Sequence, residues 1–260
     1  MISKSKLKEL AAYRQQKLCD EEGVFVVEGP KMCAEALRSG FDIKVVCATG
    51  EQRVENGERR VESGEWRVEN GEWRVESGEW YEVSQAELER LSGMRSPNQV
   101  WMLVARKELP ELRGHGTLTL ALDRIQDPGN LGTMLRTADW YGVRHVVCSA
   151  DTVSCYNPKV VQSTMGAIFR TQVDYVDLPQ WLAACGMPVY GATLGGRPLA
   201  DVELPQAPAV LLVGNESRGI SPEAMAAVTH PVLIPNRGGT AESLNAAVAA
   251  GIIMERLWNN

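Results

Sequence analysis

Residues 234–245 read IPNRGGTAESLN and are followed by the small, apolar run AAVAAGII at 246–253. An apolar strand should end at Ile234, because Pro235 cannot donate to a strand ladder. The two glycines give the loop backbone conformations that other residues avoid. We therefore predict a strand, a loop and a core-packed helix. The plainer reading is an ordinary, capped βα unit without a ligand.

We expect this last helix to run from about 242 to 258. Its first turn would then contain Glu242, Ser243 and Asn245, where N–H groups without helical partners can hold a polar ligand. The helix is nearly all Ala, Val and Ile, so we expect it to be buried on several sides.

The same alternation of strand and helix extends back to about residue 117. Strands are predicted at 118–125, 145–149, 171–176, 187–194, 209–214 and 231–234. Helices are predicted near 130–141, 158–168, 178–185 and 222–228. This order predicts an α/β domain with a mostly parallel sheet covered on both faces. Ligands bind at the carboxyl ends of such strands, which selects the loops 126–132, 214–221 and 235–242.

The first of these loops lies in residues 123–139, DRIQDPGNLGTMLRTAD. Pro, Gly and Asn make a tight turn into the helix. Arg136 follows Gly132 by four residues, within reach of the strand ends, and an arginine can grip a phosphate bidentately. The alternative role for Arg136 is an ion pair with Asp139 or Asp123.

The second loop lies in residues 211–222, LLVGNESRGISP. Gly214 permits close approach of a ligand, and Asn215 and Glu216 should lie at the rim of the sheet. The alternative is a polar turn with a helix cap. The chain has no GxGxxG after the first strand and no GxxxxGK[ST] motif, so a dinucleotide or P-loop site is not supported. The residue types suit binding of a nucleoside-like cofactor and orientation of a phosphate or hydroxyl.

Taken in order, the three loops resemble the motifs of the SpoU (TrmH-like) branch of the SPOUT RNA methyltransferases. The matching residues are Asn130-Leu131-Gly132 with Arg136, Gly214-Asn215-Glu216 with Arg218-Gly219, and Ile234-Pro235 with Glu242-Ser243-Leu244-Asn245. The resemblance covers about 117–260, and residues 157–167 also resemble the segment between the first two motifs. Ser217 stands where Gly is commoner, Asn236-Arg237 replaces a more apolar pair, and the third loop is one residue longer.

The resemblance implies a C-terminal trefoil knot, a homodimer joined through the helix that begins near Ser243, and S-adenosylmethionine as cofactor, without a metal. It implies methyl transfer to a ribose 2′-hydroxyl of structured RNA, with ribosomal RNA favoured and transfer RNA as the alternative. The catalytic residues would be Arg136, Asn130 and Glu216. The cofactor-binding residues would be Leu194, Gly214, Asn215, Gly219, Ile234, Ser243, Leu244 and Asn245. The alternatives are a non-catalytic RNA-binding paralogue acting in ribosome assembly and a nucleotide-dependent metabolic enzyme.

Residues 1–105 resemble the RNA-binding substrate domain that many members carry in front of the knotted domain. The resemblance includes FVVEGP at 25–30. We expect strands near 24–27, 43–48, 81–83 and 100–105, and helices near 7–14, 32–37 and 85–91. Ser84 and Glu87 have the residue types of a capping box. Residues 106–116 are predicted to be a linker.

A repeat of seven residues fills 53–80, in the units RVENGER, RVESGEW, RVENGEW and RVESGEW. Each unit has a glycine and little to bury, so this is not a coiled coil. Asn-Gly favours a hairpin turn, and a mobile surface insertion is the other reading. The repeat contains three tryptophans but also eight glutamates, which would repel phosphate, so we assign it no function.

The whole chain has 260 residues, 44% hydrophobic content and a net charge of −6. The net charge argues mildly against nucleic acid as a partner. The N-terminus lacks the apolar run of a secretory signal, and no stretch approaches the length of a membrane span. The six scattered cysteines form no CxxC pair, so we expect free thiols in a reducing cytoplasm.

Overall fold

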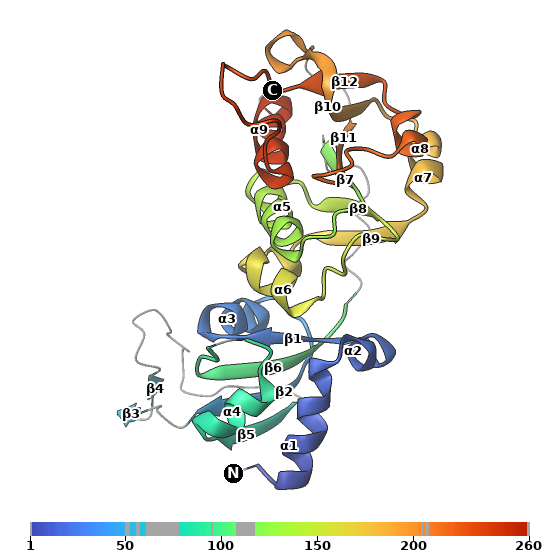
Figure 1. The fold of residues 1–260 in the computed structure, drawn as a ribbon. Helices are drawn as coiled ribbons and strands as arrows, with labels where there is room; N and C mark the ends of the chain where they lie inside the picture. The colour runs from blue at the N-terminus through green and yellow to red at the C-terminus, as the bar shows by residue number, and fades with distance from the viewer. Residues whose placement is uncertain are drawn as a thin grey trace. The chain divides into compact units, whose positions relative to one another are not determined.

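The computed structural model describes residues 2–49, 53–55, 58–60, 78–94, 96–107, 118–203, 205 and 208–258. The chain divides into two compact units, residues 1–107 and 108–260 (Figure 1). Most of the predicted linker, from residue 108 on, lies outside the described residues.

The N-terminal unit is a four-stranded mixed sheet with helices. Its elements are α1 (Lys4–Ala11), η1 (Ala12–Arg14), α2 (Gln16–Glu22), β1 (Val24–Glu28), α3 (Pro30–Arg38), β2 (Ile43–Thr49), β5 (Glu79–Val83), α4 (Gln85–Leu91) and β6 (Val100–Ala105). The strand order is β1-β6-β2-β5, and β2 and β5 are parallel whereas β6 is antiparallel to both of its neighbours. Leu10, Leu88 and Trp101 are fully buried in its core.

The local signals in this unit are largely confirmed. The Ser84 side chain accepts from the Glu87 backbone N–H, and the Glu87 carboxylate accepts from the Ser84 N–H, so the predicted capping box is present. Strand β6 has the predicted bounds.

The heptapeptide repeat is described only at its two ends. Strands β3 (Arg53–Glu55) and β4 (Glu58–Arg60) pair antiparallel across the first Asn-Gly step, as the hairpin reading expects. Residues 61–77 lie outside the described residues. The last two residues of the repeat, Glu79 and Trp80, belong to β5 and pair with β2, so the repeat does not end before the domain sheet resumes.

The C-terminal unit has six parallel strands and helices between them. Its elements are β7 (Leu118–Asp123), α5 (Pro128–Trp140), β8 (His145–Ser149), α6 (Pro158–Thr164), η2 (Ala167–Phe169), β9 (Gln172–Val176), α7 (Leu178–Ala184), β10 (Val189–Pro198), η3 (Leu199–Asp201), β11 (Ala209–Gly214), α8 (Pro222–Met225), β12 (His230–Leu233) and α9 (Ala246–Trp258). The strand order is β12-β10-β11-β7-β8-β9, and every adjacent pair is parallel. The predicted parallel α/β sheet is confirmed.

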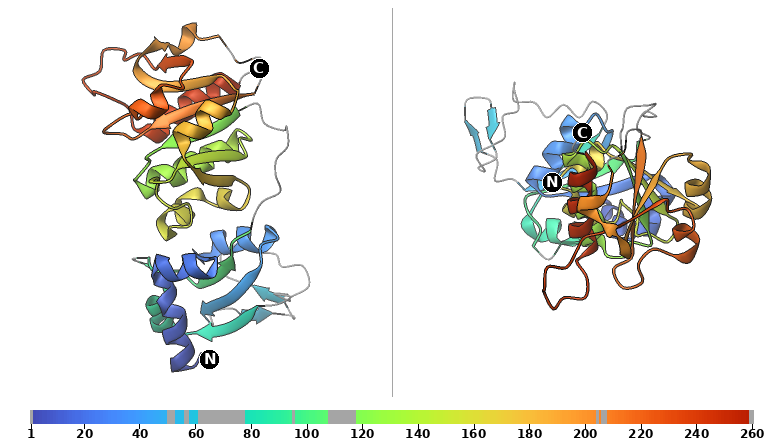
Figure 2. Two further views of the ribbon diagram at one scale, coloured as in Figure 1. Left: turned by 90° about the vertical axis from the view of Figure 1, so that its right-hand side faces the viewer. Right: turned by 90° about the horizontal axis from the view of Figure 1, so that it is seen from above.

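Helices cover both faces of this sheet. In Figure 1, α5, α6 and α9 lie on one face and α7 and α8 on the other, and Figure 2 shows the same separation from above. Successive strand residues point to opposite faces. Ala121, Val210 and Leu212 accordingly pack with Leu182 of α7 and Ala224 of α8. Because helices cover both faces of the sheet, the central strands β7 and β11 have mostly apolar sequences.

The predicted start of the last helix is wrong by four residues. The Asn245 side-chain oxygen accepts from the backbone N–H groups of Ala247 and Val248, at 2.9 and 3.2 Å. Asn245 thus takes the position of an N-cap, and α9 begins at Ala246. Glu242 and Ser243 lie in the loop before the helix and are exposed.

In the part of the chain that the structure describes, no helix is both long and apolar enough to cross a membrane.

Candidate active site

The first two selected loops and the N-cap of α9 meet through one chain of side-chain hydrogen bonds. Asn130, in the first turn of α5, donates from Nδ2 to the Glu216 carboxylate. Asn245 donates from Nδ2 to Asn130 Oδ1, at 2.9 Å. Asn130 therefore links residues that lie 86 and 115 positions further along the chain. We call these three residues the amide–carboxylate cluster.

The backbone of the second loop closes tightly on itself. Asn215 and Gly219 exchange two hydrogen bonds, from Asn215 N to Gly219 O at 3.1 Å and from Gly219 N to Asn215 O at 2.8 Å. Gly219 has a φ of +67°, and a Cβ at Gly214 would lie 2.3 Å from the Gly219 carbonyl carbon. Both glycines are therefore required by the turn itself.

The Asn215 side chain joins this turn to the end of β7. Its Oδ1 accepts from the N–H groups of Ser217 and Arg218, at 3.0 and 3.2 Å, and its Nδ2 donates to the Arg124 carbonyl at 2.9 Å. The Asp123 carboxylate, almost fully buried, accepts from the Ser221 N–H at 2.6 Å. The carboxyl ends of β7 and β11 are thus fixed together.

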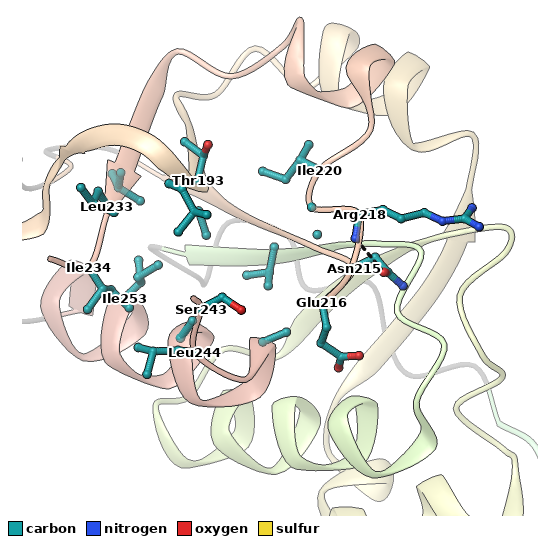
Figure 3. Close-up of a pocket in the computed structure, with 18 of the residues that line it drawn as sticks. Thr193, Asn215, Glu216, Arg218, Ile220, Leu233, Ile234, Ser243, Leu244 and Ile253 are labelled. Carbon is teal, nitrogen blue, oxygen red and sulfur yellow. Dashed lines mark hydrogen bonds between the residues drawn. The ribbon is translucent and has the colours of Figure 1, made fainter. Parts of the chain in front are cut away.

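A cavity of about 600 Å³ opens between these loops (Figure 3). Its walls come from the middle of β10, the second loop, the end of β12 and the start of α9 with the loop before it. The lining residues are Ala192, Thr193, Leu194, Val213, Gly214, Asn215, Glu216, Ser217, Arg218, Gly219, Ile220, Met225, Val232, Leu233, Ile234, Glu242, Ser243, Leu244, Ala246, Ala249 and Ile253. The size is within the range of about 300–1,000 Å³ that is usual for small-molecule sites.

Seven of the eight residues predicted to bind the cofactor line this cavity, and the eighth, Asn245, belongs to the amide–carboxylate cluster. Sequence reasoning selected the apolar lining residues Leu194, Ile234 and Leu244 but not Ile220 and Ile253. Both isoleucines are buried and look like core residues in a sequence, so no motif signal marked them.

The side chains at the mouth of the cavity point in different directions. In Figure 3, Glu216 extends toward α5, whereas Arg218 extends away from Leu233 and Ser243. Burial, with a further contribution from the Asp127 carboxylate, raises the pKa of Glu216. The Asn130 amide that faces Glu216 is a hydrogen-bond donor suited to the charged form.

Arg136 does not join the amide–carboxylate cluster within one chain. It lies six residues after Asn130 on α5, which turns it by about 240° and moves it about 9 Å along the helix. Arg136 is exposed, and within the described residues its side chain makes no hydrogen bond or ion pair. The partners considered for it are engaged elsewhere, because Asp139 pairs with Arg170 at 2.8 Å and Asp123 contacts Ser221.

Among the described side chains, no three His, Cys, Asp or Glu residues gather into a group that could hold a metal ion.

The fold and the site define an α/β protein that binds a small ligand at the carboxyl ends of parallel strands. Residues 117–255 match the model of the SpoU rRNA Methylase family, and residues 4–101 match an MRM3-like substrate binding domain. The first match spans more than half of the chain. The chain belongs to the SpoU rRNA methylase family, a family of RNA methyltransferases.

Relatives align over nearly the whole chain. The chain is 31% identical to the 23S rRNA (guanosine(2553)-2′-O)-methyltransferase RlmP of Bacillus subtilis strain 168, over 97% of this chain and 95% of the relative. A TrmH-family protein from Porphyromonas gingivalis matches with a TM-score of 0.81 and 34% identity, covering 99% of this chain and 98% of that one. An AdoMet-bound rRNA methyltransferase from Sinorhizobium meliloti matches with a TM-score of 0.81 and 27% identity, covering 99% and 95%.

Proposed function

We propose that this protein transfers a methyl group from S-adenosylmethionine to a ribose 2′-hydroxyl of ribosomal RNA. The observation that carries the proposal is the amide–carboxylate cluster beside a cavity of about 600 Å³, both built from the three family motifs. The names of the relatives support it, since one acts on a 2′-O position of 23S rRNA and another was crystallised with AdoMet.

The residues of the cavity fit this cofactor. The tight turn leaves no room for a side chain at Gly214, and both Gly214 and Gly219 line the cavity. The charged lining residues are Glu216, Arg218 and Glu242, so two carboxylates outnumber one guanidinium, which suits a cationic sulfonium ligand. When bound, S-adenosylmethionine would supply an electrophilic methyl group. The main chain around Gly214, Ile234 and Leu244 would hold its adenine and methionine parts, with Leu194, Asn215, Gly219, Ser243 and Asn245 nearby.

Three side chains would serve the transfer. Asn130 and Glu216 would shape the place where the target ribose lies. Arg136 would bind the phosphate next to that ribose and help to draw the proton from the 2′-hydroxyl. The guanidinium is an awkward base by itself because it stays protonated, so its main effect would be to orient the substrate.

We propose a homodimer formed through α9. Val248 and Ile252, four residues apart on α9, expose 52% and 41% of their surface, and Leu244, in the loop just before the helix, exposes 47%. Trp140, on the neighbouring α5, is 83% exposed. Large apolar residues gathered on one face mark an interaction site, and a second copy of the same stripe is its natural complement in a two-fold contact.

We also propose a trefoil knot within residues 117–260. After the edge strand β12, the chain returns so that α9 packs on α5 and on the central strand β11. That return past the loops after β7 and β11 supports threading, an exception to the usual unknotted topology.

The domain of residues 1–105 would bind the RNA. It contains the insertion at 53–80, and the linker at 106–116 would join it to the knotted domain. We propose that the enzyme is located in the cytoplasm, because ribosomal RNA is its proposed substrate.

The test is methyl transfer from S-adenosyl-[methyl-³H]methionine to ribosomal RNA, with mass spectrometry of the nucleosides. We expect label in ribose-methylated nucleosides. Arg136→Ala should lower kcat by roughly 10²–10⁴-fold and leave S-adenosylmethionine binding unchanged. Arg144→Ala, which removes another exposed arginine of the same unit, is the matched control and should behave like the wild type.

Label on a base instead of a ribose would refute the 2′-hydroxyl target. RNA binding without any transfer would favour the non-catalytic paralogue, which neither the family match nor the relatives support. If Arg136→Ala loses cofactor binding and unfolds, the arginine is structural.

A further inference from the structure

The loop between β12 and α9 has no regular secondary structure from Ile234 to Asn245. Its residues are largely exposed, yet both of its ends line the cavity. Ile234 lies at one end, and Glu242, Ser243 and Leu244 lie at the other. Something must therefore hold the exposed middle of the loop if the walls of the cavity are to be in place.

Asn236 makes four hydrogen bonds to the backbone of this same loop. Its Oδ1 accepts from the N–H groups of Gly238 and Gly239, at 2.9 and 2.8 Å. Its Nδ2 donates to the carbonyls of Gly239 and Ala241, at 3.0 and 3.3 Å. Both ends of the amide are used, and the bonds span the middle of the loop.

The backbone is shaped to meet this side chain. Gly238 has a φ of +100°, in the region that other residues rarely adopt. This conformation accompanies the two adjacent N–H groups that meet one Asn236 oxygen. Within the described residues, the other polar side chains of the loop before Asn245 make no hydrogen bond or ion pair; these are Arg237, Thr240, Glu242 and Ser243.

We infer that Asn236 is a positioning residue that preorganises the third loop for cofactor binding. Its four bonds hold the loop, so that Ile234 and Leu244 already form walls of the cavity before a ligand arrives. Preorganisation improves affinity because less conformational freedom is lost on binding. This role rests on the proposed function for the identity of the ligand, but the order of the free loop does not depend on it.

The inference also explains a departure from the family pattern. In the sequence, Asn236-Arg237 stands out from the family resemblance as a polar pair in a loop with one residue more. A longer exposed loop has more freedom to lose on ordering. An asparagine at its start supplies internal hydrogen bonds where an apolar side chain would supply none.

The test compares Asn236→Ala with Thr240→Ala, the control, since Thr240 lies in the same loop and its side chain makes no described hydrogen bond. In the absence of ligand, hydrogen exchange at the amides of Gly238 and Gly239 should become faster in Asn236→Ala and stay unchanged in the control. The Kd and the KM for S-adenosylmethionine should both rise about tenfold, which is ~1.4 kcal/mol. The kcat at saturating cofactor and the melting temperature should be nearly unchanged.

A second variant separates the two ends of the amide. Asn236→Asp keeps the acceptor for Gly238 and Gly239 but turns the donor toward the Gly239 and Ala241 carbonyls into an acceptor. It should keep the protection of the two amides better than Asn236→Ala and still weaken cofactor binding.

Two results would overturn the inference. One is unchanged exchange and unchanged cofactor affinity in Asn236→Ala. The other is a fall in kcat with an unchanged KM, because that pattern indicates a direct part in the chemistry. If the wild type does not bind S-adenosylmethionine, the proposed function fails, while the exchange measurement still decides whether Asn236 orders the loop.

Discussion

Replacing Gly214 by alanine tests whether the tight turn after β11 is the floor of the cofactor site. A Cβ at this position would lie 2.3 Å from both the Gly219 carbonyl carbon and the Ile220 nitrogen, and 2.5 Å from the Gly219 oxygen. All three atoms belong to the backbone, so no flexible side chain can move aside. The turn itself has to open by about 1 Å to restore a normal contact of ~3.5 Å.

The magnitude follows from two contributions. Overpacking of a well-packed site costs about 1–3 kcal/mol. Opening the turn also weakens the two hydrogen bonds between Asn215 and Gly219, each worth about 0.5–1.5 kcal/mol. We expect a loss of about 2–5 kcal/mol, which lowers the melting temperature of the C-terminal unit by roughly 4–20 °C. Because the turn lines the cavity, S-adenosylmethionine binding should be lost as well.

Calorimetry gives both quantities, by thermal scanning and by titration with S-adenosylmethionine. The matched control is Gly195→Ala, because Gly195 is also a strand glycine of this unit but a Cβ there meets nothing within 4 Å. The control should change stability by no more than about 0.5 kcal/mol. A Gly214→Ala protein that melts and binds like the wild type would refute the reasoning from the turn.

Three further predictions concern other parts of the molecule. Gly132→Ala should destabilise by about 1–3 kcal/mol in urea, since its Cβ would lie 2.4 Å from that of Ser163, whereas Gly251→Ala, with its nearest contact at 3.6 Å, should stabilise by about 0.5–1 kcal/mol. Burial raises the pKa of the Glu28 carboxyl, so the stability that protonated Glu28 contributes is complete below its ordinary pKa and is lost as the pH rises through the raised one. Urea titrations should show the wild type gaining stability relative to Glu28→Gln as the pH falls toward the ordinary carboxyl pKa, and the opposite slope would contradict this. Val248→Asp should give a folded monomer by light scattering, because it places a charge in the middle of the apolar stripe on α9, and an unchanged dimer would exclude that stripe as the interface.

Much of the fold could be predicted because the signals are local. Strands β6, β8 and β11 have their predicted bounds, since each is built around a short, buried apolar run. The capping box before α4 was also predicted, because both of its partners lie within four residues of sequence. The alternation of strand and helix then implies the parallel sheet.

The start of α9 could not be predicted, because it depends on a competition that the sequence leaves open. Glu242, Ser243 and Asn245 are all acceptable in a first helical turn or before it. Asn245 fixes the start of α9, because its side chain accepts from the N–H groups of Ala247 and Val248. The same side chain donates to Asn130, 115 residues away. That contact exists only after the sheet has formed.

The candidate site also contains residues that could be predicted from the sequence and residues that could not. Motif residues with polar side chains, such as Asn130 and Glu216, were selected from sequence and do meet in space. The apolar walls were selected only in part, because Ile220 and Ile253 differ in no local respect from core residues. Asn236 was noted in the sequence only as a departure, and its four bonds became visible only with the loop in three dimensions.

The position of Arg136 ties the proposed chemistry to the proposed dimer. On α5, Arg136 and Trp140 are four residues apart and so share a face, and that face is turned by about 240° from Asn130. A guanidinium so placed does not contact the amide–carboxylate cluster of its own chain. Trp140 on the same face is 83% exposed, beside the apolar stripe of α9. A two-fold contact through this surface would bring Arg136 to the partner, so the folded Val248→Asp monomer should bind S-adenosylmethionine but transfer methyl groups poorly. A monomer with full kcat would mean that Arg136 acts on RNA bound to its own subunit.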